Sequence, residues 1–310
     1  MATRREFLGA SSALFGTVLV GGATGLPSSA SGAAKTALLQ RPIPSSGEMV
    51  PVIGMGTSGS FQVSPNGPEY QALKEVLNRF VDGGGKIIDT APTYGNAEDN
   101  LGTLFRASGL RPRTFIATKL SGVSGVEQGL EQFASTLRRL GTDKVELLQV
   151  HNLGDWKTQL EVARRLKAEG KIRYVGLTHY VESAQDQLAD AVQASKPDFL
   201  QINYSVRQRG AEKRVFPLAK QLGVAVLANR NFEDGALFDR VQGKSLPSWA
   251  AEAGVTSWAQ MFLKFALSHD AVTVVIPATG KPDRQSDNLK AGLGPMLTQK
   301  QKADLVALVG

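Results

Sequence analysis

The amino-acid sequence predicts an α/β protein with a single-domain (β/α)8 TIM barrel, and three observations lead to this fold class. Short apolar segments alternate with amphipathic segments along most of the 310 residues, the order expected when a helix follows each strand. The apolar segments are rich in β-branched residues on both faces, as parallel strands covered by helices are. Several end in a polar side chain, and barrels of this class carry their active sites at the carboxyl ends of the strands.

Eight strands are predicted, at residues 50–55, 86–90, 114–119, 145–151, 172–178, 199–204, 224–229 and 272–277. Helices are predicted at residues 70–82, 98–107, 126–140, 156–169, 184–194, 212–222, 256–268 and 282–290, with a last amphipathic helix at 298–309. Pro282 suits a first helical turn, which needs no backbone N–H. Little chain remains after residue 291 or between His151 and Trp156, so we expect an open, shallow substrate cleft.

The first 34 residues differ in composition from the rest of the chain. Arg4 and Arg5, within Thr-Arg-Arg-Glu-Phe-Leu, resemble a twin-arginine export signal, and an apolar, glycine-rich run and then small residues follow. A membrane span needs about 20 strongly apolar residues, so we predict a signal peptide cleaved near residues 30–34 and no stable membrane anchor. The implied partner is the twin-arginine (Tat) translocase, the implied location is periplasmic or extracellular, and the barrel covers residues 35–310.

Composition excludes several classes of function. The chain has no cysteine, which rules out disulfides, thiolate catalysis, cysteine metal sites and a lipid attached to cysteine. Its formal net charge is +7, but the basic residues are scattered and form no run interleaved with aromatic residues, so nucleic-acid binding is not predicted. The three histidines lie on different predicted elements, and no cluster has the spacing of metal ligands. The sequence contains no signal for an oligomeric state.

The segment Gly54-Met-Gly-Thr-Ser-Gly59 fits the Gly-x-Gly-x-x-Gly pattern of dinucleotide-binding Rossmann folds. That pattern requires a helix to begin immediately, so that the helix N-terminus faces the pyrophosphate. Residues 60–68 instead contain two prolines and a further glycine, which the interior of a helix would not accommodate. The segment is therefore predicted to be the end of the first barrel strand and the loop after it.

Four polar side chains stand at or just after three consecutive strand ends. Asp89 lies at the end of one strand, Tyr94 in the turn that follows it, Lys119 at the end of the next strand and His151 at the end of the one after. The carboxyl ends of barrel strands meet on one face, so these groups are expected to converge. Each residue has an ordinary alternative, as a turn cap, a packed phenol, a solvated lysine or a rim histidine. Their joint order favours an active site.

In type and order these residues resemble the catalytic tetrad of the aldo-keto reductases, and the resemblance extends from about residue 50 to residue 291. It implies NAD(P)H-dependent, reversible reduction of an aldehyde or ketone carbonyl, with Tyr94 as the general acid and, in reverse, the general base. Lys119, paired with Asp89, would favour the phenolate and so make the phenol a stronger acid. His151 would hydrogen-bond the carbonyl oxygen and orient the substrate.

The resemblance also implies residues that hold the nicotinamide half of the cofactor. Thr57 and Asp89 would lie near the cofactor. The residues matching the positions that hold the carboxamide are Thr178, His179 and Gln201, with His179 standing where the family usually has asparagine. Where the family has a stacking aromatic residue followed by Ser-Pro, this chain has Asn229-Arg-Asn-Phe232. Candidate cofactor contacts in this segment are Asn229, Arg230 and Phe232, with Arg230 proposed to bind the pyrophosphate.

Residues 276–288 resemble the family's adenosine-phosphate segment. Arg284 matches the arginine that binds the 2′-phosphate, and Asp287 and Asn288 would reach the adenine. The usual Lys-Ser is replaced by Ala278 and Thr279, so one phosphate-binding charge is missing. The resemblance therefore implies NADP(H) as the preferred cofactor and NAD(H) as the second candidate.

Two other classes of function remain open. A non-catalytic nicotinamide-binding barrel, acting as a sensor or a partner subunit, is favoured by the altered stacking segment and disfavoured by the intact tetrad. A phosphate-handling barrel enzyme of another family would give Tyr94 no role. The catalytic interpretation implies a small-molecule carbonyl substrate without identifying it.

Overall fold

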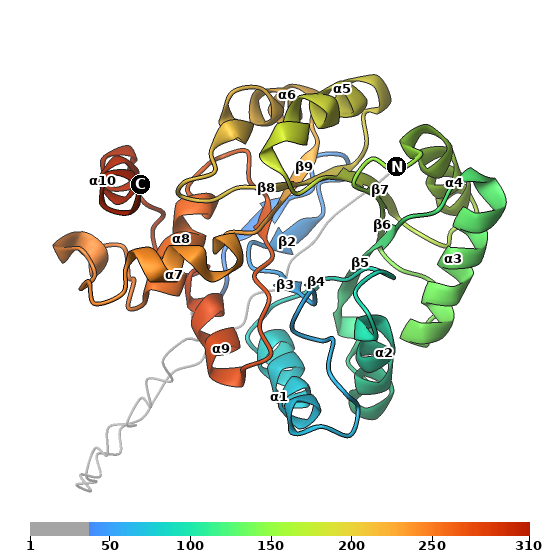
Figure 1. The fold of residues 1–310 in the computed structure, drawn as a ribbon, viewed down its shortest axis with the longest axis horizontal. Helices are drawn as coiled ribbons and strands as arrows, with labels where there is room; N and C mark the ends of the chain where they lie inside the picture. Colours follow the sequence, from blue (N-terminus) through green and yellow to red (C-terminus); the bar gives the residue numbers. More distant parts are fainter. Residues whose placement is uncertain (1–36) are drawn as a thin grey trace, which may run out of the picture. The chain divides into compact units, whose positions relative to one another are not determined.

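The strands of the computed structural model, which describes residues 37–310, form one closed parallel barrel (Figure 1). They pair in chain order: β3 (Met55–Gly56), β4 (Ile87–Asp89), β5 (Phe115–Leu120), β6 (Leu147–His151), β7 (Tyr174–Thr178), β8 (Phe199–Asn203), β9 (Ala225–Asn229) and β10 (Val274–Val275). Parallel bridges from Ile53 to Val275 and from Gly56 to Ala278 close the ring. The predicted (β/α)8 fold is confirmed.

Helices surround the strands on the outside of the barrel (Figure 1). They are α1 (Pro68–Asp82), α2 (Ala97–Ser108), α3 (Gly125–Leu140), α4 (Trp156–Ala168), α5 (Gln185–Ser195), α6 (Val215–Leu222), α8 (Trp258–Leu267) and α9 (Pro282–Lys290). Their inner faces have helical spacing: α1, for example, buries Leu73, Val76 and Phe80, positions one and two turns apart on one side of a helix. Two further helices, α7 (Ala236–Arg240) and α10 (Gln299–Val309), lie outside this ring.

The glycine-rich segment near residue 55 closes the barrel, and no helix begins directly after it. A Cβ atom on Gly56 would lie 2.9 Å from the carbonyl oxygen of Ile276, so only glycine allows the two backbones to approach this closely. The amide of Gly56 donates a hydrogen bond to Pro277 O at 3.0 Å. Helix α1 begins only at Pro68, which agrees with the rejection of a Rossmann motif.

Alternation along the strands divides the barrel interior into an apolar lower part and a polar upper part. The interior apolar cluster includes Ile87, Phe115 and Leu147, near the amino ends of β4, β5 and β6. Every second residue of a strand points to the same face. Asp89 and Gln149 therefore point inward, two residues after Ile87 and Leu147. Lys119 also points inward, four residues after Phe115. The strands therefore carry their polar groups at the carboxyl end of the barrel.

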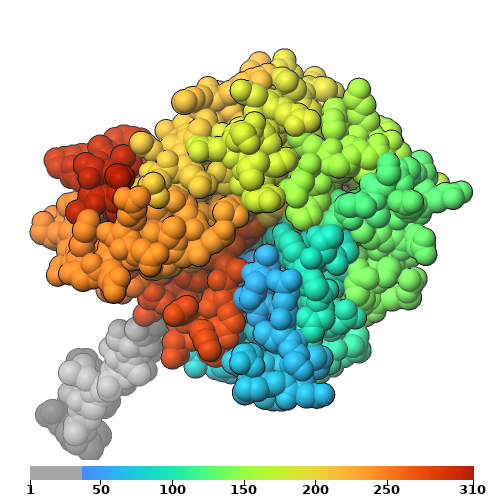
Figure 2. Space-filling view, viewed as in Figure 1, coloured from blue at the N-terminus to red at the C-terminus, as the bar shows by residue number. Residues whose placement is uncertain are grey.

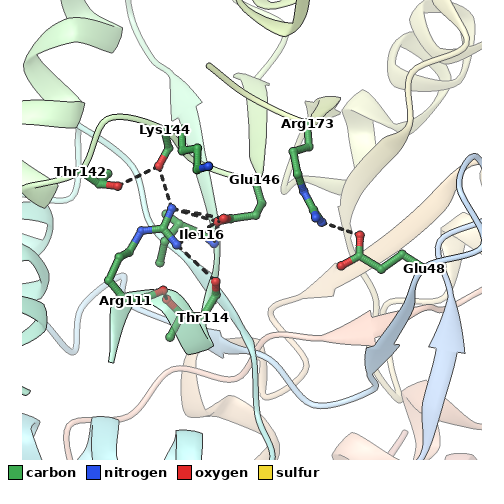
Figure 3. Close-up of polar contacts among 8 residues, drawn as sticks. All are labelled: Glu48, Arg111, Thr114, Ile116, Thr142, Lys144, Glu146 and Arg173. Atoms are coloured by element: carbon green, nitrogen blue, oxygen red, sulfur yellow. Dashed lines mark hydrogen bonds and ion pairs between the residues drawn. The ribbon is translucent and has the colours of Figure 1, made fainter. Parts of the chain in front are cut away.

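An antiparallel hairpin, which the sequence analysis did not predict, lies at the amino end of the barrel. Strands β1 (Gln40–Pro42) and β2 (Met49–Pro51) form it, so the predicted strand 50–55 is divided between β2 and β3. Figure 3 shows the charged contacts at this end: Glu146 accepts hydrogen bonds from Arg111 and, at 2.7 Å, from the amide of Ile116, while Arg173 pairs with Glu48 of the hairpin. These contacts fix the end opposite the predicted site.

Residues 1–34, the predicted export signal, lie outside the described residues. Across residues 37–310, the helices are all too short or too polar to cross a membrane.

Candidate active site

A buried ion pair between Asp89 and Lys119 forms the base of the site. The Lys119 ammonium donates to both carboxylate oxygens of Asp89 and to the carbonyl oxygen of Thr90, each at 2.8 Å, and these contacts match its three N–H donors. Lys119 is 1% exposed and Asp89 3%. Burial, the largest single effect, lowers the pKa of Lys119, but the effects of Asp89 and Tyr94 together raise it more, so the net direction is upward and the ammonium stays charged.

Tyr94 lies above this pair, in the turn between β4 and α2. The Lys119 Nζ is 5.0 Å from the centre of the Tyr94 ring. Burial raises the pKa of the phenol, the charge of Lys119 lowers it, and the net direction is upward. The predicted effect of Lys119 on the pKa of Tyr94 is therefore confirmed in direction, while burial of the phenol, which the sequence did not reveal, outweighs it.

His151, at the end of β6, faces Tyr94 edge-on, with the two ring centres 6.0 Å apart. Burial, and then the charges of Lys119 and His179, lower the pKa of His151 to about 4. The imidazole is therefore neutral near pH 7. Its Nδ1 atom lies 2.7 Å from the hydroxyl oxygen of Ser121. The four residues of the predicted tetrad thus come together, with Asp89 and Lys119 beneath and Tyr94 and His151 above.

A pocket of about 780 Å³ opens above the tetrad, within the size range of cofactor and small-molecule sites. Nine of the residues predicted for the site line it: Asp89, Tyr94, His151, Thr178, Gln201, Asn229, Arg230, Phe232 and Arg284. The pocket therefore joins the predicted catalytic residues to both halves of the predicted cofactor site.

Other predicted residues lie outside the lining of this pocket. Lys119 is buried beneath it, and Thr57 donates to the carbonyl oxygen of Asp89 at 3.0 Å. Asp287 accepts from Ser257 at 2.5 Å and from Gln260 at 2.6 Å, so its carboxylate holds the start of α8. The remaining residues of this group are His179, Thr279 and Asn288. Their proposed contacts with the cofactor stay predictions.

The segment between β9 and α8 forms one wall of the pocket, and of its residues only Arg230 and Phe232 were predicted for the site from the sequence. It contains α7, and Phe232, Asp234 and Phe238 from it line the pocket. In Figure 2 its orange surface lies on the left of the face shown and reaches toward the blue surface of the first barrel loop near the centre. An open, shallow cleft was expected from the short chain end and the short loop after His151. The segment between β9 and α8 adds a wall to the pocket that those two features do not reveal.

Three non-glycine residues of this segment, Arg230, Glu233 and Asp234, have positive φ angles of 52°, 51° and 55°. Such conformations cost energy and persist where surrounding contacts hold them. Asn231 donates to the carbonyl oxygen of Tyr204 at 2.9 Å, and Glu233 accepts from Ser205 at 2.5 Å. The loop is thus tied to the segment after β8.

Arg230 is placed at the pocket but is already engaged. It pairs with Asp234 at 2.5 Å, and its guanidinium lies 5.3 Å from the centre of the Tyr180 ring. A phosphate bound by Arg230 would therefore compete with Asp234.

Several pocket or supporting residues were missed from the sequence. Tyr180 and Phe238 are 43% and 38% exposed and give the pocket an aromatic rim, while Gln149 lies within the barrel with its amide nitrogen 3.4 Å from Asp89. The position of Gln149, two residues before His151 on the inward face of a predicted strand, was a signal that could have identified it. Across residues 37–310, no group of three His, Cys, Asp or Glu side chains is arranged to hold a metal ion.

Comparison with known proteins identifies the family to which the chain is similar. The model of the "Aldo/keto reductase family" matches residues 52–309. Morphine 6-dehydrogenase of Pseudomonas putida is 27% identical over 78% of this chain and 82% of its own length, and methylglyoxal reductase YeaE of Escherichia coli is 26% identical over 76% and 84%. An aldo/keto reductase of Klebsiella pneumoniae, solved with NADP and acetate, is 25% identical with a TM-score of 0.72, covering 89% of this chain and 95% of that one.

Proposed function

Because this chain belongs to the aldo/keto reductase family, we propose that it is an oxidoreductase that reduces small aldehydes or ketones to alcohols with NADPH. The observation that carries this proposal is the convergence of Asp89, Tyr94, Lys119 and His151 beneath a pocket of about 780 Å³. A phosphate-handling barrel enzyme would give no role to the phenol of Tyr94 beside the buried ammonium of Lys119.

The described residues fit a nicotinamide cofactor. Thr178 donates to the amide oxygen of Gln201 at 3.0 Å, which leaves the Gln201 amide N–H groups as donors at the pocket. The amide oxygen of Asn229 is buried without a hydrogen-bond partner in the described part of the chain. An amide such as the nicotinamide carboxamide could satisfy donors and acceptors of this kind. Arg230 and Arg284, both in the pocket lining, would bind phosphate groups.

NADPH would supply the hydride to the carbonyl carbon, and the protein's own residues would manage the oxygen. Tyr94 would donate the phenolic proton to the oxygen as negative charge develops there. His151, neutral and adjacent to Tyr94, would donate a hydrogen bond to the same oxygen and orient it. Lys119 would act through its charge, because its three donors are bound to Asp89 and Thr90.

The substrate class follows from the pocket and the relatives. Tyr180, Phe232 and Phe238 add aromatic surface to a pocket whose base is polar, and one of the relatives reported above is a methylglyoxal reductase. We therefore propose small activated carbonyl compounds, such as 2-oxoaldehydes and aromatic aldehydes, as substrates. NADH is the second candidate cofactor, since Ala278 stands where a phosphate-binding lysine is usual.

The test is the loss of NADPH absorbance with methylglyoxal, phenylglyoxal or 4-nitrobenzaldehyde, measured on the purified protein and on Tyr94→Phe. The unchanged protein should turn over and the variant should not, while both bind NADPH equally in a fluorescence titration. NADPH binding without turnover of any compound would favour the non-catalytic sensor or partner subunit. Absence of NADPH and NADH binding would contradict both.

We further propose that residues 1–34 direct export through the Tat translocase to the periplasm or outside the cell. The support is the paired Arg4 and Arg5 ahead of an apolar run. Tat export carries folded proteins, so the barrel could cross with its cofactor bound. Fractionation of cells expressing the full chain tests this: Arg4→Lys with Arg5→Lys should hold the full-length precursor in the cytoplasm. Cytoplasmic full-length protein without any substitution would contradict the proposal.

A further inference from the structure

Ser121 is the first residue after β5, the strand that carries Lys119. Hydrogen bonds fix both its backbone N–H and its backbone carbonyl. The Gln132 side chain of α3 accepts a hydrogen bond from Ser121 N at 2.7 Å and donates one to Ser121 O at 2.8 Å. Ser121 is 3% exposed. The serine backbone is therefore fixed and buried, and its hydroxyl can be reoriented only by rotation about the side chain's own Cα–Cβ and Cβ–Oγ bonds.

That hydroxyl lies 2.7 Å from Nδ1 of His151. Across residues 37–310 it makes no other hydrogen bond. The pair can be arranged in two ways: either the serine O–H donates to Nδ1, or Nδ1–H donates to the serine oxygen. In the second arrangement the buried hydroxyl hydrogen would have no acceptor, and an unsatisfied buried donor is costly. The first arrangement satisfies both groups.

The choice between these arrangements decides which ring nitrogen of His151 carries the proton. The ring is neutral, and a hydrogen bond at one nitrogen sets the tautomer at the other. If Nδ1 accepts from Ser121, Nε2 carries the hydrogen and can donate it to a carbonyl oxygen in the pocket. If Nδ1 carried the hydrogen, Nε2 would be an acceptor and would repel that oxygen. The other polar or charged groups facing the ring are Tyr94, Lys119 and His179.

We propose that Ser121 is a positioning residue that holds His151 in the Nε2–H tautomer through a hydrogen bond to Nδ1. It touches neither substrate nor cofactor and acts through His151. This inference rests on the proposed carbonyl reduction only for its consequence in turnover, because the tautomer is a property of the protein alone.

The experiment is nitrogen NMR of the full-length protein labelled with ¹⁵N-histidine at pH 7, recorded first without added cofactor and then with NADPH. Only three histidines are present, and His151→Gln identifies the signal of His151. The unchanged protein should show His151 protonated at Nε2. Ser121→Ala should give a mixture of tautomers, and Ser121→Thr, which keeps a hydroxyl, should restore the Nε2–H form. Protonation at Nδ1 in the unchanged protein, or an unaltered tautomer in Ser121→Ala, would overturn the proposal.

Turnover gives a second readout. In Ser121→Ala, kcat with 4-nitrobenzaldehyde should fall by about twofold or more, in proportion to the fraction of His151 that leaves the Nε2–H form, with Kd for NADPH unchanged; one ordinary hydrogen bond changes the tautomer ratio by about three- to tenfold. Ser124→Ala is the matched control, because the Ser124 hydroxyl is oriented toward Asp155 at the surface and not toward His151. A protein without turnover would contradict the proposed function while leaving the tautomer result decisive for Ser121. An equal loss in Ser124→Ala and Ser121→Ala would show a structural effect of the loop and overturn the positioning role.

Discussion

Lys119→Met removes the positive half of a nearly dry ion pair and should destabilise the protein strongly. Asp89 is 3% exposed, and after the substitution its remaining side-chain partner is the Gln149 amide at 3.4 Å. Breaking a buried pair by removing one partner costs about 3–5 kcal/mol, and we expect a loss of that size in the free energy of unfolding. The double variant Asp89→Asn with Lys119→Met removes both charges at nearly constant volume and should recover about 2 kcal/mol of this loss, the difference between the cost of an unpaired buried charge and that of one unmade hydrogen bond.

The residual cost of the double variant comes from the Thr90 carbonyl, which loses the Lys119 ammonium at 2.8 Å. One unmade hydrogen bond of this kind accounts for about 1–3 kcal/mol. Urea unfolding followed by circular dichroism on the single and double variants measures the coupling. If the double variant is no more stable than Lys119→Met alone, the charge of Asp89 is not what makes the single change costly, and the reasoning is wrong. Both variants should lack turnover, so any recovery of stability in the double variant is not accompanied by recovery of activity.

Three further outcomes are expected from the site. Tyr94→Phe removes the proton donor without removing the ring, so kcat for NADPH-dependent carbonyl reduction should fall at least about a hundredfold; a variant that keeps most of its kcat would refute the role of Tyr94. Arg284→Ala should weaken NADPH binding by about 1.5–3 kcal/mol, as for a lost charge-assisted hydrogen bond, and leave NADH binding nearly constant; equal losses in a titration would show that Arg284 does not bind the 2′-phosphate. The folded-state pKa of His151, about 4, lies below its ordinary 6.5, so between these pH values the unfolded chain binds the proton first and the stability contributed by His151 is lost as pH falls. His151→Gln should therefore lose less stability than the unchanged protein between pH 7 and pH 4.5 in urea titrations, and identical losses would contradict the shift.

The sequence predicts the barrel and the tetrad well because both depend on local patterns. Asp89, Lys119 and His151 each occur at or next to the end of an apolar, β-branched run, and parallel connection alone then brings strand ends together. Inward and outward alternation in the strands also specifies that Gln149 joins them. These features need only the order of residue types, which a single sequence contains.

The wall between β9 and α8 could not be predicted in the same way. Its shape depends on positive φ angles at Arg230, Glu233 and Asp234; arginine and glutamate carry no local signal for that conformation, and aspartate, although enriched there, adopts it only in a minority of cases. The contacts that hold it, from Asn231 to the Tyr204 carbonyl and from Ser205 to Glu233, join separate loops and exist only after folding. The hairpin of β1 and β2 was likewise hidden, because its strands are only three residues long.

The two pKa shifts in the site assign different roles to Tyr94 and His151. Burial raises the pKa of Tyr94 despite Lys119, which disfavours the phenolate needed to oxidise an alcohol. In reduction the proton transfer from Tyr94 remains favourable, because the oxygen of a carbonyl receiving a hydride develops toward an alkoxide, a stronger base than any phenolate. The same environment lowers the pKa of His151 to about 4, so at neutral pH the imidazole can donate a hydrogen bond but has no extra proton to transfer. Environments that separate the pKa values of neighbouring groups commonly define acid and base assignments. In this site they leave Tyr94 as the proton donor in reduction and His151 as the group that orients the oxygen.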